Sequence, residues 1–345
     1  MLQPHHKLAI YMQDGLDNDY GKMGFGVMRY SNNEVSCVVD RNYAGKVVSD
    51  ACELPFPYPV VGTVDEAVAL GANVLILGTA PSGGRVPDDW MQPIEQAIKN
   101  EMCLVNGLHD RLNDSFGHLL QGSDQWIWDV RQPAFTPAIA TAMARELDNK
   151  RILMVGTDMA IGKMTAGLEV YKNIRDRGLS TRFLATGQIG ITVTGEGIPL
   201  DAFKVDHACG AVETMVMGAK DADYVFVEGQ GSLVHPGSSA TLSLMRGSCA
   251  THLIMCHRAG QSHLRKPEHV EIPPLKELIQ LNEALCGVCG SLTPAKTVGI
   301  ALNTVRLDDA TAKAEIKKLE DETGLPVDDV VRYGAEKIAD AVTDA

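Results

Sequence analysis

The segment Gly156-Thr-Asp-Met-Ala-Ile-Gly-Lys-Met-Thr165 lies between an apolar run and a run with helical spacing. The apolar run, Ile152 to Val155, predicts a buried strand, and Ala166 to Arg175 carries apolar residues at the spacing of a helix face. A glycine-bounded loop between a strand and a helix is the context in which backbone N–H groups and a helix N-terminus hold a phosphate. The segment therefore predicts a phosphate-binding loop within an α/β fold.

The lysine of this loop is followed by an unusual residue. Lys163 would add positive charge at the phosphates, and the next position in such loops is normally a Ser or Thr whose hydroxyl holds Mg²⁺. Here the next residue is Met164, whose thioether is a poor Mg²⁺ ligand, and Thr165 comes one position too late. We therefore expect a phosphorylated ligand and no metal ion. The expected contacts are Gly156, Thr157, Asp158, Gly162, Lys163, Met164 and Thr165.

The composition limits the class of protein. A chain of 345 residues can form two domains with sizeable cores. Its 45% hydrophobic and 22% charged residues are ordinary for a soluble globular protein, and no run approaches about 18 apolar residues. The formal charge of −13 argues against a nucleic-acid-binding surface. We expect a cytoplasmic homo-oligomer that binds small molecules and contacts neither nucleic acid nor membrane.

The cysteines predict a structural role. Several of the eight lie in apolar runs, where a free thiol behaves as a small hydrophobe. Cys286-Gly-Val-Cys289 is a single CxxC pair, and no second pair has the spacing of a zinc site. We therefore favour packing over metal or redox chemistry for these thiols.

Short apolar runs alternate with helix-like segments in residues 1–125. This alternation predicts a Rossmann-like domain with a mostly parallel, doubly wound sheet. Asp40 ends the second predicted strand, where dinucleotide folds often keep an acid for ribose. Gly21, Gly24 and Gly26 follow the first strand but do not form GxGxxG, so we favour a structural use of this fold over a nicotinamide site. The predicted strands are 7–12, 35–39, 60–61, 74–77 and 103–105, and the predicted helices include 64–70 and 91–100.

The strand pattern breaks at residues 126–150, where two prolines follow Trp126-Ile-Trp-Asp-Val130. We expect a connector there, followed by a second, P-loop-like α/β domain from 151 to 345 that again contains a mostly parallel sheet. Its predicted strands are 152–155, 181–185, 224–227, 252–256 and 298–302, and its predicted helices are 211–218, 275–285 and 310–322.

Four polar or glycine-rich segments follow four predicted strands of the second domain. They are Gly156 to Thr165, Ala185 to Gly190, Val227 to Pro236 and Cys256 to Gly260. Because ligands of parallel sheets bind at the carboxyl ends of the strands, we expect these segments to cluster at one edge.

Glu228 is the leading catalytic candidate in these segments. It ends an apolar strand, where the acidic residue of a P-loop protein's second motif would lie, and it could accept a proton or hold a metal. The alternative is that it caps a turn or pairs with Lys163. His235 could act as an acid or base, or could be a hydrogen-bonded structural histidine before Pro236.

Other polar residues of the segments are candidates for substrate binding. Gln188, Gln230 and Ser232 could donate to an oxyanion or a carboxylate. Arg258 suits bidentate carboxylate binding, with a structural salt bridge as the alternative. Asp206 is expected to cap the helix that follows it, and Glu213 is a weaker catalytic candidate.

At these residues the chain resembles the D-glutamate N-acetyltransferase family, formerly a family of unknown function. The resemblance covers nearly the whole chain. It rests on Gly156 to Thr165, Thr186-Gly-Gln-Ile-Gly190, Val227-Glu-Gly-Gln-Gly-Ser-Leu233 with His235-Pro236, Cys256-His257, and Asp40-Arg-Asn-Tyr-Ala-Gly45. It implies a Rossmann-like amino-terminal domain, a P-loop-like carboxy-terminal domain, and acetyl transfer from acetyl-CoA to the amino group of D-glutamate or a related acidic D-amino acid.

The implied reaction agrees with the altered phosphate loop. CoA contains a pyrophosphate and a 3′-phosphate, so a phosphate loop can hold it without phosphoryl transfer, and the missing hydroxyl at Met164 then costs nothing. Acetyl transfer also needs a base for the acceptor ammonium and donors for the thioester oxyanion. The candidates are Glu228 or His235 as the base, Gln230 and the N–H groups near Gly229 and Gly231 as donors, and Arg258 or Arg182 for an acceptor carboxylate.

Two other functions remain open from the sequence. The loop has five residues between its glycines, as in the dethiobiotin-synthetase branch of P-loop proteins, which suggests an ATP-dependent ligase or kinase. The chain could also be a nucleotide- or CoA-binding sensor without turnover. Mg²⁺-dependent ATP turnover would favour the ligase, and binding without turnover would favour the sensor.

Overall fold

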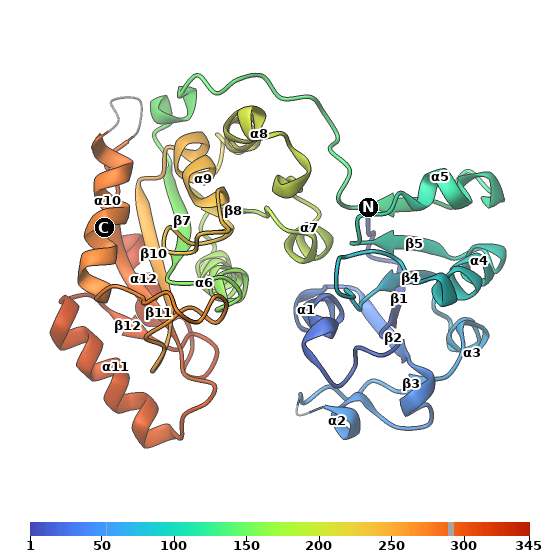
Figure 1. Cartoon of the computed structure of the whole chain (residues 1–345). Helices are drawn as coiled ribbons and strands as arrows, with labels where there is room; N and C mark the ends of the chain where they lie inside the picture. The colour runs from blue at the N-terminus through green and yellow to red at the C-terminus, as the bar shows by residue number, and fades with distance from the viewer. Residues whose placement is uncertain (53, 289–292) are drawn as a thin grey trace. The chain divides into compact units, whose positions relative to one another are not determined.

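The computed structural model describes residues 1–52, 54–288 and 293–345. The chain divides into two compact units (Figure 1). The first unit contains residues 1–133 together with 188–202, and the second contains residues 134–187 and 203–345. The connector expected at 126–150 is therefore divided between the two units.

The first unit is built on a six-stranded parallel sheet. The strands lie in the order β3-β2-β1-β4-β5-β6, so the chain winds outward from β1 in both directions. This confirms the Rossmann-like, doubly wound sheet predicted from the apolar runs. The strands are β1 (Lys7–Tyr11), β2 (Glu34–Val39), β3 (Val60–Val61), β4 (Val74–Leu77), β5 (Cys103–Asn106) and β6 (Ile127–Asp129).

Helices cover both faces of this sheet (Figure 1). Right-handed crossovers place α1 (Lys22–Tyr30) and α2 (Val48–Ala51) on one face, and α3 (Val64–Ala69), α4 (Met91–Lys99) and α5 (Leu112–Phe116) on the other. Side chains alternate along β1 and the residue that follows it. Tyr11 therefore packs in the core with Ile94 of α4, whereas Met12 faces Gly24 of α1.

The second unit contains another six-stranded parallel sheet, in the order β12-β11-β10-β7-β9-β8. Its central strand β7 carries the predicted phosphate loop at its carboxyl end. The strands are β7 (Lys150–Gly156), β8 (Thr181–Leu184), β9 (Tyr224–Val227), β10 (His252–Arg258), β11 (Lys296–Asn303) and β12 (Val327–Asp328).

The helices of the second unit follow the same crossover rule. One face carries α6 (Lys163–Asp176) and α12 (Glu336–Asp344), which contact each other. The other face carries α8 (Val205–Met217), α9 (Ala240–Ser248), α10 (Leu275–Val288) and α11 (Asp309–Thr323). The predicted P-loop-like, doubly wound sheet is confirmed.

One segment that follows β8 in sequence belongs to the first unit. Residues 188–202 begin with α7 (Gln188–Thr194), which packs on α1, where Ile189 lies against Gly26. Arg131 forms an ion pair with Asp201 and donates from Nε to the carbonyl oxygen of Gly107 at 2.7 Å. A glycine-rich turn was predicted at 185–190, but residues from Gln188 onward form a helix.

Three local predictions differ from the structure. Residues 127–129, expected in a connector, form the edge strand β6, because Ile127 is buried beside Leu104 of β5. The loop expected after the first strand contains α1 from Lys22 onward. Asp206 does not cap its helix, because α8 begins at Val205, with Lys204 at the cap position.

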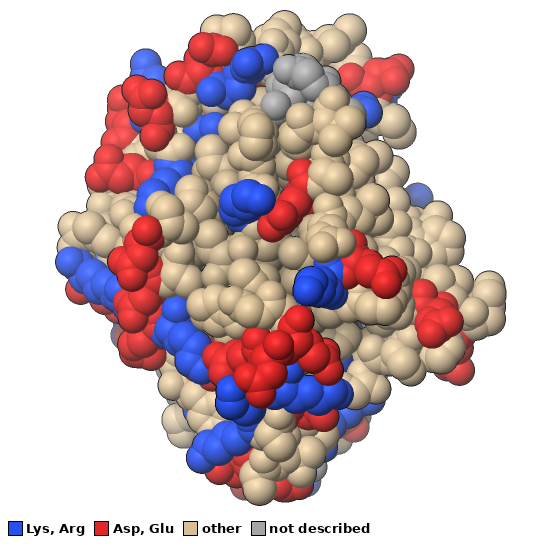
Figure 2. Space-filling model, turned by 90° about the vertical axis from the view of Figure 1, so that its left-hand side faces the viewer, with Lys and Arg blue, Asp and Glu red and all other residues tan. Residues whose placement is uncertain are grey.

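The charged residues of α11 are paired along its exposed surface. Lys313 pairs with Asp309 at 2.8 Å and Lys317 with Asp321 at 2.5 Å, each one helical turn apart. Figure 2 shows acidic and basic side chains interspersed over this side of the molecule. The acidic residues of the carboxy-terminal region therefore lie on a solvated helix face. None of the helices in the described parts of the chain is long and apolar enough to cross a membrane.

Candidate functional site

The phosphate loop joins β7 to α6 in the second unit, as predicted. Gly156 ends β7, Lys163 begins α6, and the backbone between them turns through two residues with positive φ, Ala160 at +53° and Gly162 at +110°. Residues in the left-handed region reorient the N–H groups of a loop toward one side. The first N–H groups of α6 have no partners within the helix and carry its positive dipole end, so this loop is shaped for an anion.

Lys163 is enclosed by the loop that it follows. Only 6% of its surface is exposed, and its Nζ donates to the carbonyl oxygen of Asp158 at 2.7 Å. A Cβ atom added at Gly229 would lie 1.7 Å from the carbonyl oxygen of Met154 and 3.0 Å from Cδ of Lys163, so only glycine fits between β7 and the lysine stem. Burial lowers the pKa of the Lys163 ammonium. An anion bound here would favour the charged form.

Asp158 is the acidic member of the phosphate loop, and its carboxylate is fully engaged with backbone and amide donors. Its Oδ1 accepts from the N–H of Met159 at 2.6 Å. Its Oδ2 accepts from Nε2 of Gln261 at 2.7 Å and from the backbone N–H of Arg265 at 2.8 Å. These bonds tie the segment after β10 to the loop.

Thr157 is buried and linked to the end of β10. Its N–H donates to the carbonyl oxygen of Cys256, and its Oγ1 lies 3.0 Å from Nδ1 of His257. Burial lowers the pKa of His257 to about 4 and raises the pKa of the Cys256 thiol to about 12, so both groups are neutral at pH 7. They are therefore packing and hydrogen-bonding groups of the site.

Glu228 lies at the carboxyl end of β9, next to β7 in the sheet. Its side chain is 4% exposed, and its Oε2 accepts from the N–H groups of Thr186 at 2.8 Å and Gly187 at 3.1 Å. Burial raises the pKa of the carboxyl to about 7, although these N–H groups and the charge of Lys163 act in the opposite direction. A carboxyl that titrates near pH 7 is suited to proton transfer.

Gln230 and Ser232 follow Glu228 in the same turn. Nε2 of Gln230 lies 3.4 Å from Oε1 of Glu228, so the amide borders the carboxyl group. Ser232 is buried, and its Oγ accepts from the N–H of Val234 at 3.2 Å. Gln230 is therefore placed beside the titrating carboxyl, whereas Ser232 stabilises the turn.

Both ring nitrogens of His235 have partners. Nδ1 accepts from the N–H of Gly237 at 3.1 Å, which leaves Nε2 to carry the proton and donate to the carbonyl oxygen of Lys266 at 2.7 Å. This arrangement fixes the neutral tautomer with the proton on Nε2. The geometry favours the structural interpretation of His235, because both ring nitrogens are engaged with backbone groups.

The remaining candidates are spread over the molecule. Arg258 ends β10, and its Nη2 donates to the carbonyl oxygen of Ala160 in the phosphate loop at 3.1 Å. Gln188 begins α7 and belongs to the first unit. Arg182 lies in β8 and donates to the carbonyl oxygen of Gly218 at 2.8 Å. Arg258 is the predicted carboxylate-binding residue that the structure places at the loop.

Glu213 has a structural role, and only one residue of the CxxC pair lies in the described part of the chain. Glu213 is buried in α8 and accepts from the N–H groups of Thr141 at 2.8 Å and Met143 at 2.7 Å, which holds the chain before β7 against the helix. Cys286 is buried in α10, but Cys289, the other half of the CxxC pair, lies outside the described residues. Within the described chain, no group of three potential ligands could hold a metal ion.

The residues that hold the candidates in place are not predicted from the sequence. Thr186 and Gly187 position Glu228 through their backbone N–H groups, and Gln261 and Arg265 anchor a segment on Asp158. Backbone donors carry no sequence signal. The useful signal was their position after predicted strands, where Thr186 and Gly187 were already expected to lie near the site.

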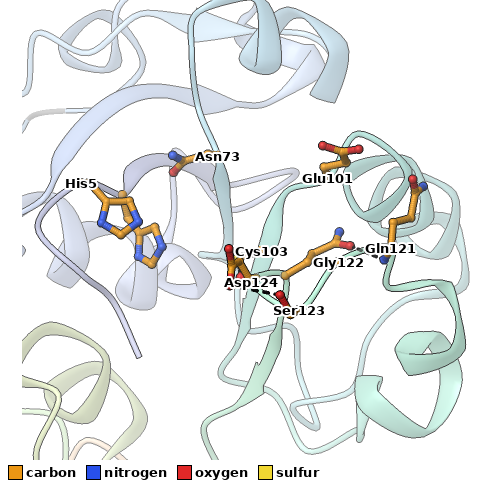
Figure 3. A pocket seen from close by; sticks show the side chains of 10 residues that line it. His5, Asn73, Glu101, Cys103, Gln121, Gly122, Ser123 and Asp124 are labelled. Atoms are coloured by element: carbon orange, nitrogen blue, oxygen red, sulfur yellow. Dashed lines mark hydrogen bonds between the residues drawn. The ribbon is translucent and has the colours of Figure 1, made fainter.

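The first unit has a separate pocket of about 370 Å³ (Figure 3). It is lined by the residues that precede β1, β4, β5 and β6, including His5, Asn73 and Gln121 to Asp124. These positions lie at the amino ends of the strands, opposite the edge where parallel sheets bind ligands. Cys103 in its wall is neutral because burial raises the pKa of the thiol.

The fold and the site define a class of two-domain α/β proteins, with a Rossmann-like domain followed by a domain that carries a phosphate loop. The model of the DUF1611_N Rossmann-like domain matches residues 41–133, and that of the DUF1611_C P-loop domain matches residues 138–339; both are described as domains of unknown function. The chain belongs to the DUF1611 family.

Two curated relatives have names that bear on function. A protein of Tritonibacter scottomollicae is 35% identical over 81% of this chain and 84% of its own length, and one of a Pseudoalteromonas species is 34% identical over 80% and 83%. Both are named D-glutamate N-acetyltransferase. The family resemblance inferred from the motifs is confirmed.

A solved structure shares the whole architecture. The crystal structure of a DUF1611 family protein from Anabaena variabilis is 44% identical and superposes with a TM-score of 0.93, covering 99% of this chain and 100% of that one. The fold of each unit is therefore shared with another member of the family.

Proposed function

We propose that this protein is an N-acetyltransferase that moves the acetyl group of acetyl-CoA to the amino group of D-glutamate or a related acidic D-amino acid. The observation that carries the proposal is Glu228, a buried carboxyl with a pKa of about 7. The positive charge of Lys163 in the phosphate loop favours the ionised form of this carboxyl. The names of the relatives, at 34–35% identity, support the same reaction.

The phosphate loop fits a CoA thioester better than a reacting nucleotide. The N-terminus of α6 and Lys163 supply donors and positive charge for a phosphate group. Met164, half-buried in the first turn of α6, has no oxygen for Mg²⁺. Phosphoryl transfer depends on such a metal ion, whereas acetyl transfer needs only that the phosphates be held.

The proposed role of Glu228 is proton transfer. The acceptor ammonium gives one proton to the carboxylate, and the neutral amine attacks the carbonyl carbon of the thioester. A C–N bond forms and the C–S bond breaks. The leaving thiolate takes the proton from Glu228, and the second amine proton goes to solvent. Since the pKa of Glu228 is about 7, the group can both take up and return a proton near neutral pH.

Two neighbours of Glu228 would assist this step. The amide of Gln230, next to the carboxyl, supplies N–H donors for the oxyanion that forms at the thioester carbonyl. Arg258, which reaches Ala160 of the loop, supplies a guanidinium for a carboxylate of the acceptor. Gln230 lies in the turn after β9 and Arg258 is the last residue of β10, so the sheet fixes where both side chains start.

The reaction can be tested by measuring release of free CoA thiol from acetyl-CoA with D-glutamate, L-glutamate and other D-amino acids as acceptors. We expect release with D-glutamate and formation of N-acetyl-D-glutamate in equal amounts, detected by mass spectrometry. Release that is independent of any amino acid would indicate thioester hydrolysis. Absence of release together with Mg²⁺-dependent ATP turnover would replace the proposal with an ATP-dependent ligase.

A further inference from the structure

An anion-binding loop that contains an aspartate poses an electrostatic problem. Asp158 lies within the phosphate loop and is 1% exposed, so its negative charge would oppose a bound phosphate. The donors gathered around it offset that charge, and two of them, Gln261 and Arg265, come from the segment after β10. The aspartate therefore serves to hold that segment beside the loop.

The segment is a short hairpin, Gln261 to Ile272, with its own hydrogen bonds. Leu264 donates to the carbonyl oxygen of Val270 at 2.9 Å, and Ile272 donates to that of Ser262 at 2.8 Å. The side chains of Leu264 and Ile272 are 1% and 8% exposed, so the hairpin is packed as well as tied. It is therefore an ordered part of the site.

Two consecutive basic residues occupy the tied positions of this hairpin. The backbone N–H of Arg265 donates to Asp158, and the backbone carbonyl oxygen of Lys266 accepts from His235 at 2.7 Å. Both side chains are exposed. Two acidic residues, Glu268 and Glu271, follow on the turn and the returning strand. The backbone bonds therefore fix the places from which the side chains of Arg265 and Lys266 extend, beside the phosphate loop.

We propose that this hairpin is the second half of the anion site, and that Arg265 and Lys266 bind a phosphate group of the acyl donor other than the one held by the loop. The inference rests on the proposed function for the identity of the donor. CoA fits because it carries a 5′-pyrophosphate and a separate 3′-phosphate. Asp158 and His235 are positioning residues, since they act through the hairpin.

The test is calorimetric titration of CoA into the full chain, compared with Lys266→Gln and with Lys220→Gln as a matched control. Lys220 is exposed in the turn before β9, at the amino end of the sheet. We expect Lys266→Gln to weaken CoA binding about fivefold at low salt, as for an exposed charge pair, and less at high salt. Lys220→Gln should bind like the wild type.

Dephospho-CoA, which lacks the 3′-phosphate, identifies the group that is bound. If Lys266→Gln weakens only CoA binding, the hairpin holds the 3′-phosphate, and if it weakens both ligands equally, the hairpin holds the pyrophosphate. An unchanged affinity for both ligands, with an intact melting curve, overturns the inference. Binding that depends on Lys266 without acetyl transfer to any amino acid would refute the proposed function and leave the anion site standing.

A double-mutant cycle tests the positioning role of Asp158. If Asp158 acts only by holding the hairpin, Lys266→Gln should have little effect on CoA affinity once Asp158 is replaced by alanine. Two independent effects that multiply would show that Asp158 does not position Lys266. The cycle is read only if Asp158→Ala still binds CoA and melts like the wild type, because a loss of folding in that background would also remove the effect of Lys266→Gln.

Discussion

The two units place the same connection at the centre of the same kind of sheet, yet only one of these connections suits an anion. In the first unit, β1 leads into α1 through residues 12–21, and in the second, β7 leads into α6 through residues 157–162. The first loop carries three aspartates, whereas the second carries one aspartate and leads into the buried Lys163.

Side chains occupy the space at the first connection. A Cβ atom at Gly24 would lie 1.9 Å from Sδ of Met12, so this glycine makes room for a side chain of its own unit. At the second connection, Gly229 makes room for the stem of Lys163, and Gly162 supplies a positive φ. We infer from the difference that the topology offers a position for a ligand, and that local charge and the occupant of each glycine's space determine whether that position suits an anion.

The largest expected effect is a difference in kcat between variants of two carboxyl groups, one after β9 and one after β2. Glu228→Gln removes the proposed base and should lower kcat for acetyl transfer by about 10²- to 10⁴-fold. Asp40→Asn alters a buried carboxyl in the first unit and should leave kcat within about twofold, as typical of a residue outside the reaction. Steady-state kinetics on both variants checks this, with melting curves to confirm folding.

The pH profile of the wild type sharpens the same point. Since Glu228 must be ionised to act as a base, kcat should fall tenfold per pH unit below about 7. Equal losses in Glu228→Gln and Asp40→Asn, or a profile that is flat between pH 5 and 8, would contradict the proposed role.

The next effect is a difference in acetyl-CoA binding between variants of the lysines that begin α6 and α1. Lys163→Ala removes the buried ammonium of the phosphate loop and should weaken acetyl-CoA binding by about 30- to 100-fold, as typical of a lost charge-assisted hydrogen bond. Lys22→Ala removes an exposed lysine at the corresponding place and should leave binding unchanged. Calorimetry with CoA measures both, and a similar loss in the two variants would refute the distinction.

Burial of Glu228 also predicts a stability difference that does not depend on activity. Its folded pKa is raised from 4.5 to about 7, so the associated stability is fully present below pH 4.5 and is lost as pH rises through 7. One pKa unit corresponds to about 1.4 kcal/mol, so the loss is on the order of 3 kcal/mol at pH 8.

We expect Glu228→Gln to escape this loss. Denaturant unfolding of the second unit should show the variant gaining stability on the wild type between pH 4.5 and 8, while the two change in parallel below that range. A gap between the two proteins that is the same at pH 4 and pH 8 would show that the carboxyl is not destabilised by burial.

A smaller effect is expected from the glycines. Gly24→Ala forces a methyl group against Met12 and should cost about 1 to 3 kcal/mol of the first unit's stability, with no change in KM for acetyl-CoA. Gly162→Ala places a side chain at a φ of +110° and should raise that KM. Thermal unfolding and kinetics on both variants check the assignment, which fails if Gly24→Ala changes KM.

The smallest effect is expected at Met164. Met164→Ser restores the hydroxyl that commonly binds Mg²⁺, yet acetyl transfer should change by no more than about twofold, because no step proposed here uses a metal. The comparison is made with and without EDTA. A gain that requires Mg²⁺ would show that this loop still favours nucleotide chemistry.

Most of both sheets was predictable because their central strands are continuous apolar runs. The runs 74–77 and 103–105 match β4 and β5, and the run 224–227 coincides with β9. The edge strand β6 was missed because it has three residues and adjoins prolines and charges. The helix α7 was missed because its glycine and β-branched residues do not resemble a helix, and packing on α1 compensates.

The candidate site was predictable only in part. Glu228 and the phosphate loop could be found because strand order brings their positions together at one sheet edge. The hydrogen bond between the His235 ring and Lys266 could not be predicted, because 31 residues separate the two partners. The bond between Asp158 and Arg265 spans 107 residues and could not be predicted either. Such bonds depend on tertiary folding and leave no periodic pattern.

The place of residues 188–202 in the first unit bears on how the protein can be dissected. The chain passes between the units at 133–134, at 187–188 and at 202–203. A fragment ending at residue 133 would expose the apolar surface of α1 that Ile189 covers, and a fragment spanning the P-loop match at 138–339 would carry α7 without its support. We therefore expect that neither unit folds alone when it is cut out as a contiguous piece of sequence.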